Sequence, residues 1–269
     1  MAEGIAVAAG AGELAGKLAV ITGGSRGIGR AIAARFVAEG ARVVIAARDQ
    51  ASLDQAVSAL NSGGEVCRGV RADLSTVDGV NAVVEAATAW GGIDILVNNV
   101  GGAPIGNFLT LSDEQFLGAW SLKLLAGIRL TRAAVPQMTE RGGGSIINII
   151  GVGGREPSAE ATTIGTTNAA IRALTKGLSR DLASKGIRIN AVSPGRVRTE
   201  RNISLTKQSA EARGVSFEEV EAEGLKAIPM QRLVEPSELA EVALLLAGNR
   251  VPSLTGAEIV LDGGQTHYI

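Results

Sequence analysis

The chain has 269 residues, 46% of them hydrophobic, with 26 basic and 27 acidic side chains and a net charge of -1. That length and apolar content suffice for one large core, and the balanced charge gives no electrostatic case for nucleic-acid binding. The single cysteine, Cys67, excludes an intrachain disulfide and any metal site built from several cysteines. No metal site is expected.

The N-terminal residues, 1–15, are rich in Ala and Gly and lack the basic segment that opens a secretory signal. They favour a flexible extension. The longest uncharged run, 95–112, contains paired Asn, paired Gly and a Pro, which is untypical of a transmembrane helix. We therefore expect a cytoplasmic protein without a membrane or nucleic-acid partner.

Short apolar runs alternate along the chain with longer amphipathic ones. Runs rich in Val and Ile and apolar on both faces are typical of parallel strands covered by helices. The predicted strands are 18–22, 42–47, 94–99, 145–150 and 187–193, with weaker candidates at 65–72 and 258–264. The predicted helices are 27–39, 51–61, 77–90, 113–139, 161–185 and 236–248.

This alternation predicts an α/β fold, a single doubly wound Rossmann domain over 16–269 with a mostly parallel seven-stranded sheet. One segment, 197–234, interrupts the alternation. It is polar and contains four closely spaced glutamates. We interpret it as a lid over the site and not as a second domain.

The stretch "LAVITGGSRGIGRAIAARF" (18–36) combines a strand, a glycine-rich turn and a helix. Gly23 permits a tight turn, Gly27 lets backbone N–H groups approach a pyrophosphate, and Gly29 lets helix and strand pack closely. The alternative is an ordinary glycine-rich turn. We expect a dinucleotide to contact Gly23, Ser25, Arg26, Gly27, Ile28 and Gly29.

The end of the second strand helps to choose the cofactor. An acidic residue there would bind the ribose 2′-hydroxyl of NAD, but the strand ends in Ala46, Ala47 and Arg48. Arg48 and Arg26 would suit a 2′-phosphate, so the sequence favours NADP over NAD. Alternatively, Arg48 is a solvated loop residue whose charge the neighbouring Asp49 partly cancels.

From about residue 15 to 265 the chain resembles the short-chain dehydrogenase/reductases. The resemblance is carried by the glycine motif "TGGSRGIG", by "ADL" (72–74), by "NNVG" (98–101), by "SPGRVRT" (193–199) and by "LTGAEIVLDGG" (254–264). It implies Asp73 at the adenine and Asn99 at the ribose, and the same two motifs contribute Leu74 and Gly101 to the expected cofactor contacts. Around the nicotinamide it implies Pro194, Gly195, Val197 and Thr199.

The family's chemistry uses a Tyr, a Lys four residues later, a Ser thirteen residues before the Tyr, and an Asn on the preceding helix. On that pattern the Tyr position is Ile164, the Lys position Asn168, the Ser position Gly151 and the Asn position Lys123. All four are changed.

Lys and Asn thus exchange positions. We hypothesise that Lys123 and Asn168 are the catalytic pair: the Lys123 ammonium reaches the space of the missing Lys, and Asn168 still binds the ribose. The alternative is that Lys123 extends to solvent or to an interface. Thr163 and Thr167 are weaker candidates, because a Thr hydroxyl is a poor proton reservoir and packing or capping explains both residues.

A second possible proton source is the C-terminal pair His267 and Tyr268, the only His and the only Tyr of the chain. Family members are commonly tetramers, and in some of them the tail approaches a neighbouring subunit's pocket. The pair could therefore act in trans, or the tail could simply pack or fray. A homo-oligomer, either a tetramer or a dimer, is expected on the same resemblance.

Three functions remain open. The favoured one is an NADP-dependent oxidoreductase with an atypical active site, acting on a small carbonyl or alcohol substrate. The others are a non-redox lyase, hydrolase or isomerase on the same scaffold, and a non-catalytic nucleotide-binding subunit. Gly151, Gly153 and Gly154 leave room for a bulky substrate, or form a flexible loop. The sequence does not identify the substrate.

Overall fold

The computed structural model describes residues 12–268, and its centre is one seven-stranded sheet. Every pairing between neighbouring strands is parallel, so the sheet expected to be mostly parallel is entirely so. The strand order is β3-β2-β1-β4-β5-β6-β7. The strands are β1 (Leu18–Thr22), β2 (Arg42–Ala47), β3 (Cys67–Arg71), β4 (Ile95–Asn98), β5 (Gly144–Ile149), β6 (Ile187–Pro194) and β7 (Glu258–Leu261).

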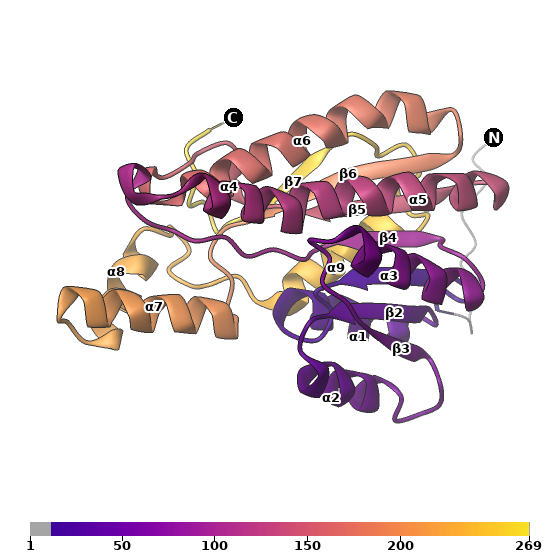
Figure 1. Ribbon diagram of the computed structural model, residues 1–269, viewed down its shortest axis with the longest axis horizontal. Coiled ribbons are helices and arrows are strands. Elements are labelled where there is room, and N and C mark those ends of the chain that lie inside the picture. The colour runs from indigo at the N-terminus through magenta and orange to yellow at the C-terminus, as the bar shows by residue number, and fades with distance from the viewer. Residues whose placement is uncertain (1–11, 269) are drawn as a thin grey trace.

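Helices cover both faces of the sheet, as expected for strands that are apolar on both sides (Figure 1). One hydrophobic core joins the sheet to α1 (Gly27–Ala38), α2 (Gln50–Leu60) and α9 (Pro236–Ala247). The other core joins it to α3 (Val77–Ala89), α5 (Ala126–Glu140) and α6 (Thr162–Ala183). Cys67 is a buried core residue, and burial raises the pKa of its thiol to about 12, so the thiol is not poised to react.

The strand order reverses at β1, since β2 and β3 lie on one side of it and β4 to β7 on the other. In open α/β sheets, ligands bind at the carboxyl ends of the strands where this reversal opens a crevice. Residues after β1 and β4 meet there. The Asn99 side chain donates a hydrogen bond from Nδ2 to the Thr22 carbonyl at 2.9 Å, and the Thr22 hydroxyl accepts from the Asn99 backbone N–H at 2.8 Å.

The helix predicted over 113–139 is interrupted. It consists of α4 (Asp113–Ala119), a π-helical turn η2 (Trp120–Leu125) and then α5. The sequence pattern predicted one continuous helix over this range and did not reveal the π-helical turn. Single π-turns within helices occur frequently at functional sites.

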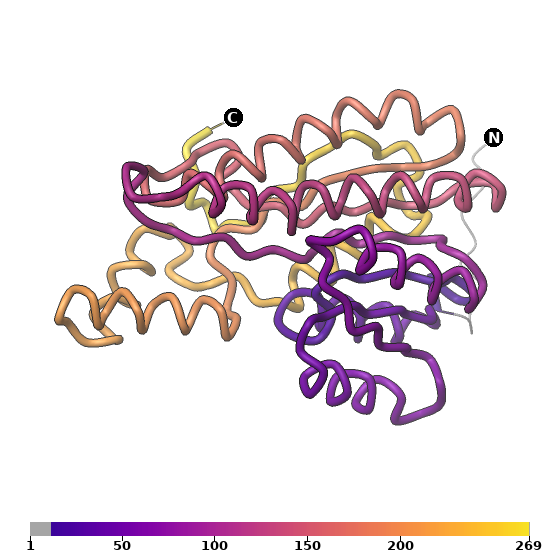
Figure 2. The backbone as a smooth tube through the Cα atoms, viewed as in Figure 1, coloured from indigo at the N-terminus to yellow at the C-terminus, as the bar shows by residue number. Residues whose placement is uncertain are grey.

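The segment 197–234 holds two helices, α7 (Glu200–Arg213) and α8 (Phe217–Lys226), which were not predicted individually. They project from the body of the molecule on the left of Figure 1. The chain between β4 and α4 runs toward the same side (Figure 2), and Arg201 on α7 donates to the Ala103 carbonyl in that connection at 3.2 Å. The connection between β4 and α4 includes the short helix η1 (Phe108–Thr110). Two further short helices, η3 (Val152–Gly154) and η4 (Ala159–Ala161), follow β5.

The expected N-terminal extension falls mostly on residues 1–11, outside the described part of the chain. Leu14 is only 1% exposed and belongs to the core formed with α1 and α9, so the packed domain begins before residue 16. Within residues 12–268, no helix is both long and apolar enough to cross a membrane.

Candidate active site

The turn between β1 and α1 depends on its glycines, and the tight turn at Gly23 and the close packing at Gly29 agree with their spacing in the sequence. Gly23 and Gly27 have φ values of +66° and +51°, in the left-handed region that favours glycine. A Cβ on Gly29 would lie 2.3 Å from the Gly23 carbonyl oxygen and 2.6 Å from Asn99 Nδ2. The absence of side chains at these positions lets the N-terminus of α1 sit against the ends of β1 and β4.

The N-terminus of α1 offers its backbone N–H groups to a ligand. Arg26 is the N-cap residue and makes no side-chain capping bond, and the first turn contains no acid. By contrast, Asp49 caps α2 and Thr76 caps α3. An uncapped N-terminus at the mouth of a crevice is suited to binding a phosphate anion.

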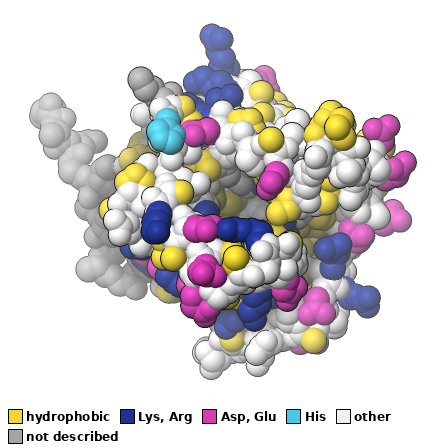
Figure 3. Space-filling model, turned by 90° about the vertical axis from the view of Figure 1, so that its left-hand side faces the viewer, with side chains coloured by type: hydrophobic (Ala, Val, Ile, Leu, Met, Phe, Trp, Pro, Cys, Tyr) yellow, Lys and Arg dark blue, Asp and Glu magenta, His cyan; other side chains and the backbone are white. Residues whose placement is uncertain are grey.

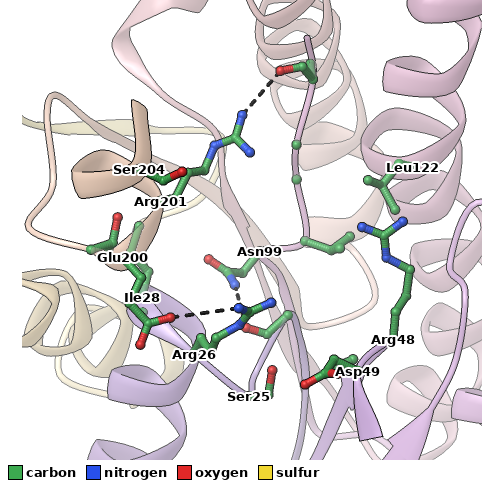
Figure 4. Close-up of a pocket in the computed structure, with 18 of the residues that line it drawn as sticks. Ser25, Arg26, Ile28, Arg48, Asp49, Asn99, Leu122, Glu200, Arg201 and Ser204 are labelled. Carbon is green, nitrogen blue, oxygen red and sulfur yellow. Dashed lines mark hydrogen bonds and ion pairs between the residues drawn. The ribbon is translucent and has the colours of Figure 1, made fainter. Parts of the chain in front are cut away.

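A cleft of about 1250 Å³ opens at this end of the sheet (Figure 4). It is bounded by the glycine turn, by the ends of β2 and β4, and by α7. Ten of the residues predicted from the sequence to contact a cofactor line this cleft; they are Gly23, Ser25, Arg26, Gly27, Ile28, Arg48, Leu74, Asn99, Gly101 and Thr199. Two more, Asn168 and Pro194, line the adjoining chamber toward α6.

Four predicted cofactor residues line neither space, namely Gly29, which packs inside the turn, and Asp73, Gly195 and Val197. The Asp73 carboxylate is exposed and accepts bonds from the Ser75 backbone N–H and hydroxyl, at 3.0 and 2.8 Å. Val197 is buried and bridges to Val234. Gly195 packs on the end of β7, because a Cβ there would lie 2.8 Å from Gln265 Oε1.

At the expected ribose position, Arg48 extends along the wall of the cleft (Figure 4). The neighbouring carboxylate of Asp49 is already occupied, because it accepts the Ser52 backbone N–H at 2.9 Å as the N-cap of α2. Hydrogen bonds from Ser52 lower the pKa of Asp49. Across the cleft, Arg26 lies 3.9 Å from the Glu200 carboxylate, and both side chains are well exposed.

At the inner end of the cleft, the π-helical turn directs Lys123 inward. Its Nζ donates to Asn168 Oδ1 at 2.8 Å and to the Ile150 carbonyl at 3.1 Å. Burial, with the positive charge of Arg201 as a second cause, lowers the pKa of Lys123 to about 8. Lys123 is half-buried, and its two hydrogen bonds direct the ammonium toward α6 and the end of β5.

Asn168 lies on α6 and is only 2% exposed. The loop after β5 can approach it because two of its residues are glycines. A Cβ on Gly151 would lie 3.1 Å from Asn168 Nδ2, and one on Gly154 would lie 2.9 Å from Asn168 Cβ. These two glycines therefore serve close packing against α6, whereas Gly153 faces open space.

The other residues of this part of α6 carry no titratable group. Ile164 and Thr167 line the chamber beside Lys123. Thr167 donates its hydroxyl to the Thr163 carbonyl at 2.7 Å, and Thr163 donates to the Pro104 carbonyl at 2.6 Å. Both hydroxyl protons are thus committed to backbone acceptors, in line with a structural role.

The C-terminal pair lies elsewhere in the same chain. His267 Nδ1 is 3.0 Å from Glu156 Oε1, and the His267 side chain is 88% exposed (Figure 3). The Tyr268 ring lies under the Arg155 guanidinium, 4.8 Å from its centroid. Neither residue lines the cleft or the chamber.

Sequence reasoning missed Arg201, which lines both the cleft and the chamber. Its position two residues after Thr199 was the available signal, but an arginine at the start of a polar segment is unremarkable by itself. No group of three or more His, Cys, Asp or Glu among residues 12–268 is arranged to hold a metal ion.

Comparisons with known proteins agree with this architecture. A family model described as enoyl-(acyl carrier protein) reductase matches residues 23–266. The chain is 37% identical over 257 residues to oxidoreductase UcpA of Salmonella typhimurium, covering 95% of this chain and 96% of that protein.

Two solved structures show the same fold with a nicotinamide cofactor. L-sorbose reductase from Gluconobacter frateurii, complexed with NADPH and L-sorbose, matches with a TM-score of 0.91 and 34% identity over 95% of this chain and 98% of that one. A 3-oxoacyl-(acyl-carrier-protein) reductase from Agrobacterium tumefaciens with NADP bound matches with a TM-score of 0.84 and 28% identity, covering 93% and 95%.

Proposed function

The chain belongs to the short-chain dehydrogenase/reductase family, and on that premise we propose that it is an NADP(H)-dependent oxidoreductase of small carbonyl compounds or alcohols. Its active site is atypical, because Lys123 and Asn168 stand at the positions of the family's Asn and Lys, and Gly151 and Ile164 stand at those of its Ser and Tyr. The observation that carries the proposal is the hydrogen bond of 2.8 Å between Lys123 Nζ and Asn168 Oδ1 at the inner end of the cleft.

The cleft suits a dinucleotide with a 2′-phosphate. The uncapped N-terminus of α1 would receive the pyrophosphate. Arg48 would bind the 2′-phosphate, while Asp49 is engaged at its own helix and would not compete for a 2′-hydroxyl. When bound, the cofactor supplies or accepts the hydride.

Lys123 is the group we assign to the proton. Its ammonium has three N–H donors, and Asn168 and the Ile150 carbonyl accept two of them. The third is available to the chamber that Lys123 lines. In a reduction, Lys123 would donate a proton to the substrate oxygen that becomes the alcohol.

A pKa of about 8 suits this role near neutral pH. Below that pH the side chain is an ammonium and can act as an acid in reduction. Above it the side chain is a neutral amine and can act as a base in alcohol oxidation. Asn168 is a positioning residue, because its Oδ1 fixes the Lys123 ammonium and Asn168 is itself fixed by packing against Gly151 and Gly154.

Titration of the purified protein with NADPH and with NADH, followed by fluorescence and calorimetry, tests the cofactor assignment. We expect tighter binding of NADPH. A panel of ketones and aldehydes, followed at the nicotinamide absorbance, then tests turnover. Turnover without an absorbance change would favour a non-redox enzyme, and tight binding without turnover would favour a nucleotide-binding subunit. Failure to bind either nucleotide would overturn the proposal.

A further inference from the structure

The chamber between Lys123 and α7 has an unbalanced charge. It has a volume of about 210 Å³ and adjoins the larger cleft. Of the fourteen described residues that line it, Lys123 and Arg201 are cationic and none is acidic. The rest are apolar residues, glycines, Thr167, Asn99 and Asn168. Lys123 is half-buried and Arg201 is exposed to solvent. The chamber therefore presents two positive charges and no negative charge, which favours an anionic ligand.

Arg201, like Arg48 on the wall of the cleft, differs from three other arginines at this end of the molecule, because those three have carboxylate partners. Arg26 lies 3.9 Å from Glu200, Arg198 lies 2.7 Å from Glu235, and Arg213 lies 2.8 Å from Glu223. Arg201 has no carboxylate within 4.0 Å anywhere in residues 12–268. It donates from Nη2 to the Ala103 carbonyl at 3.2 Å (Figure 4), which orients the guanidinium without neutralising it. Arg201 and Ala103 both line the chamber.

We propose that the substrate is a small oxo compound bearing a carboxylate or phosphate, with its anionic group on Arg201 and its carbonyl oxygen at Lys123. This inference rests on the proposed function and names its substrate class. A guanidinium binds an oxyanion through two parallel N–H donors, so it would also fix the direction in which the carbonyl enters. The chamber is smaller than the 300–1,000 Å³ typical of sites for drug-sized ligands, which indicates a compact substrate.

The charges also exclude a competing class of substrate. An iminium ion would need no proton donor and could explain the missing Tyr, but its positive charge would face Lys123 and Arg201 together. Lys123 and Arg201 both line this chamber, and the positive charge of Arg201 is the lesser cause of the lowered pKa of Lys123. An anionic group on Arg201 would offset that effect and favour the Lys123 ammonium, which is the form that donates a proton.

The reduction balances with these groups. A hydride from NADPH forms the new C–H bond as the carbonyl π bond breaks, so the oxo carbon is reduced and NADPH becomes NADP⁺. The resulting alkoxide takes a proton from the Lys123 ammonium, and the neutral amine regains a proton from solvent. The carboxylate or phosphate on Arg201 is unchanged by the reaction.

Binding of product analogues to the NADP⁺ complex tests the assignment without turnover. The probes are 3-hydroxybutyrate against 3-hydroxybutyramide, and glycerol 3-phosphate against glycerol, by calorimetry and thermal shift. We expect at least one anion to bind at least tenfold more tightly than its neutral counterpart, and the two pairs distinguish carboxylate from phosphate. Arg201→Gln should remove that preference.

Lys207→Gln is the matched control, because Lys207 is exposed on the same helix and lines neither space. It makes the same change in net charge and should leave anion binding unaltered. Equal binding of anions and neutral analogues by the wild-type protein would overturn the inference. So would a loss of NADP⁺ affinity in Arg201→Gln with anion preference retained, since Arg201 would then belong to the cofactor site.

The experiments distinguish a failure of the NADP(H) assignment from a failure of the anionic-substrate assignment. If wild-type protein does not bind NADP⁺, the same titrations are made on the free protein. Anion binding that depends on Arg201 but not on Lys207 would then support the chamber assignment alone, and its absence would contradict it.

Discussion

The two ends of the cleft are built in different ways. At the outer end, the glycine turn shapes the site through the backbone, and a single Cβ at Gly29 would collide with the Gly23 carbonyl. At the inner end, the site is made by two side chains, Lys123 and Asn168, on helices 45 residues apart in the chain. Backbone sites leave a regular spacing in the sequence, whereas side-chain pairs leave only two isolated residues. The outer end is therefore constrained by shape and the inner end by charge.

The largest expected effect comes from filling the outer end. Gly29→Ala should abolish measurable NADPH binding and lower the free energy of unfolding by about 1–3 kcal/mol, because the new methyl group cannot be accommodated. Nucleotide titration and chemical denaturation measure the two effects. Gly153→Ala is the control, since a Cβ there meets nothing within 4 Å. If both variants bind NADPH and unfold like the wild-type protein, the outer end is not constrained by the shape of its backbone.

At the inner end, Lys123→Met should lower the rate of carbonyl reduction by roughly 10²–10⁴-fold, the usual contribution of a general acid. The affinity for NADPH should change by less than about twofold, because the outer end is untouched. Single-turnover kinetics and nucleotide titration separate the two quantities, with thermal unfolding as the check on folding. A parallel loss of affinity and rate would mean that Lys123 belongs to the cofactor site.

A smaller effect is expected from the charge at the ribose position. Arg48→Gln should reduce the preference for NADPH over NADH by about 10–100-fold, the value of a charge-assisted hydrogen bond, and leave NADH affinity unchanged. Arg71→Gln is the control, because Arg71 is exposed at the end of β3 and does not line the cleft. If the two variants behave alike, another group recognises the 2′-phosphate.

The smallest effect is a shift in pH dependence. Asn168→Asp places a carboxylate where an amide oxygen lies 2.8 Å from Lys123 Nζ. A neighbouring negative charge favours the ammonium, so the pKa of Lys123 should rise from about 8 by roughly one unit or more. Reduction should then persist to higher pH than in the wild-type protein. A pH–rate profile that is unchanged, or moves to lower pH, would contradict the pairing.

The strand, turn and helix of the outer end were predictable because their constraints are local. Gly23, Gly27 and Gly29 lie within seven residues, between a strand and a helix. Five of the seven strands were predicted for a similar reason, since each is a short apolar run with clear ends, whereas β3 and β7 were only weaker candidates because β3 contains two arginines and β7 begins with a glutamate. The helix α8 also left a signal that was not used, because Ser216 and Glu219 form its capping box.

The inner end was predictable only as a hypothesis. The exchange of Lys and Asn suggested Lys123 and Asn168, but their contact depends on how α6 packs against the π-helical turn. Arg201 could not be singled out, because its role depends on the absence of an acidic partner in three dimensions. Whether a charged side chain has a partner depends on which residues the fold brings near it, and not on its neighbours in the sequence.

The most direct test of the inner end is the titration of Lys123 itself, which needs no substrate. Protein labelled with ¹³Cε-lysine reports the charge of each lysine by NMR, and the spectrum of Lys123→Met identifies the Lys123 resonance. The structure predicts a midpoint at about pH 8, because burial and Arg201 disfavour the ammonium. A midpoint at the ordinary lysine value of about 10.4 would show that Lys123 is solvated and would contradict its assignment as the proton donor.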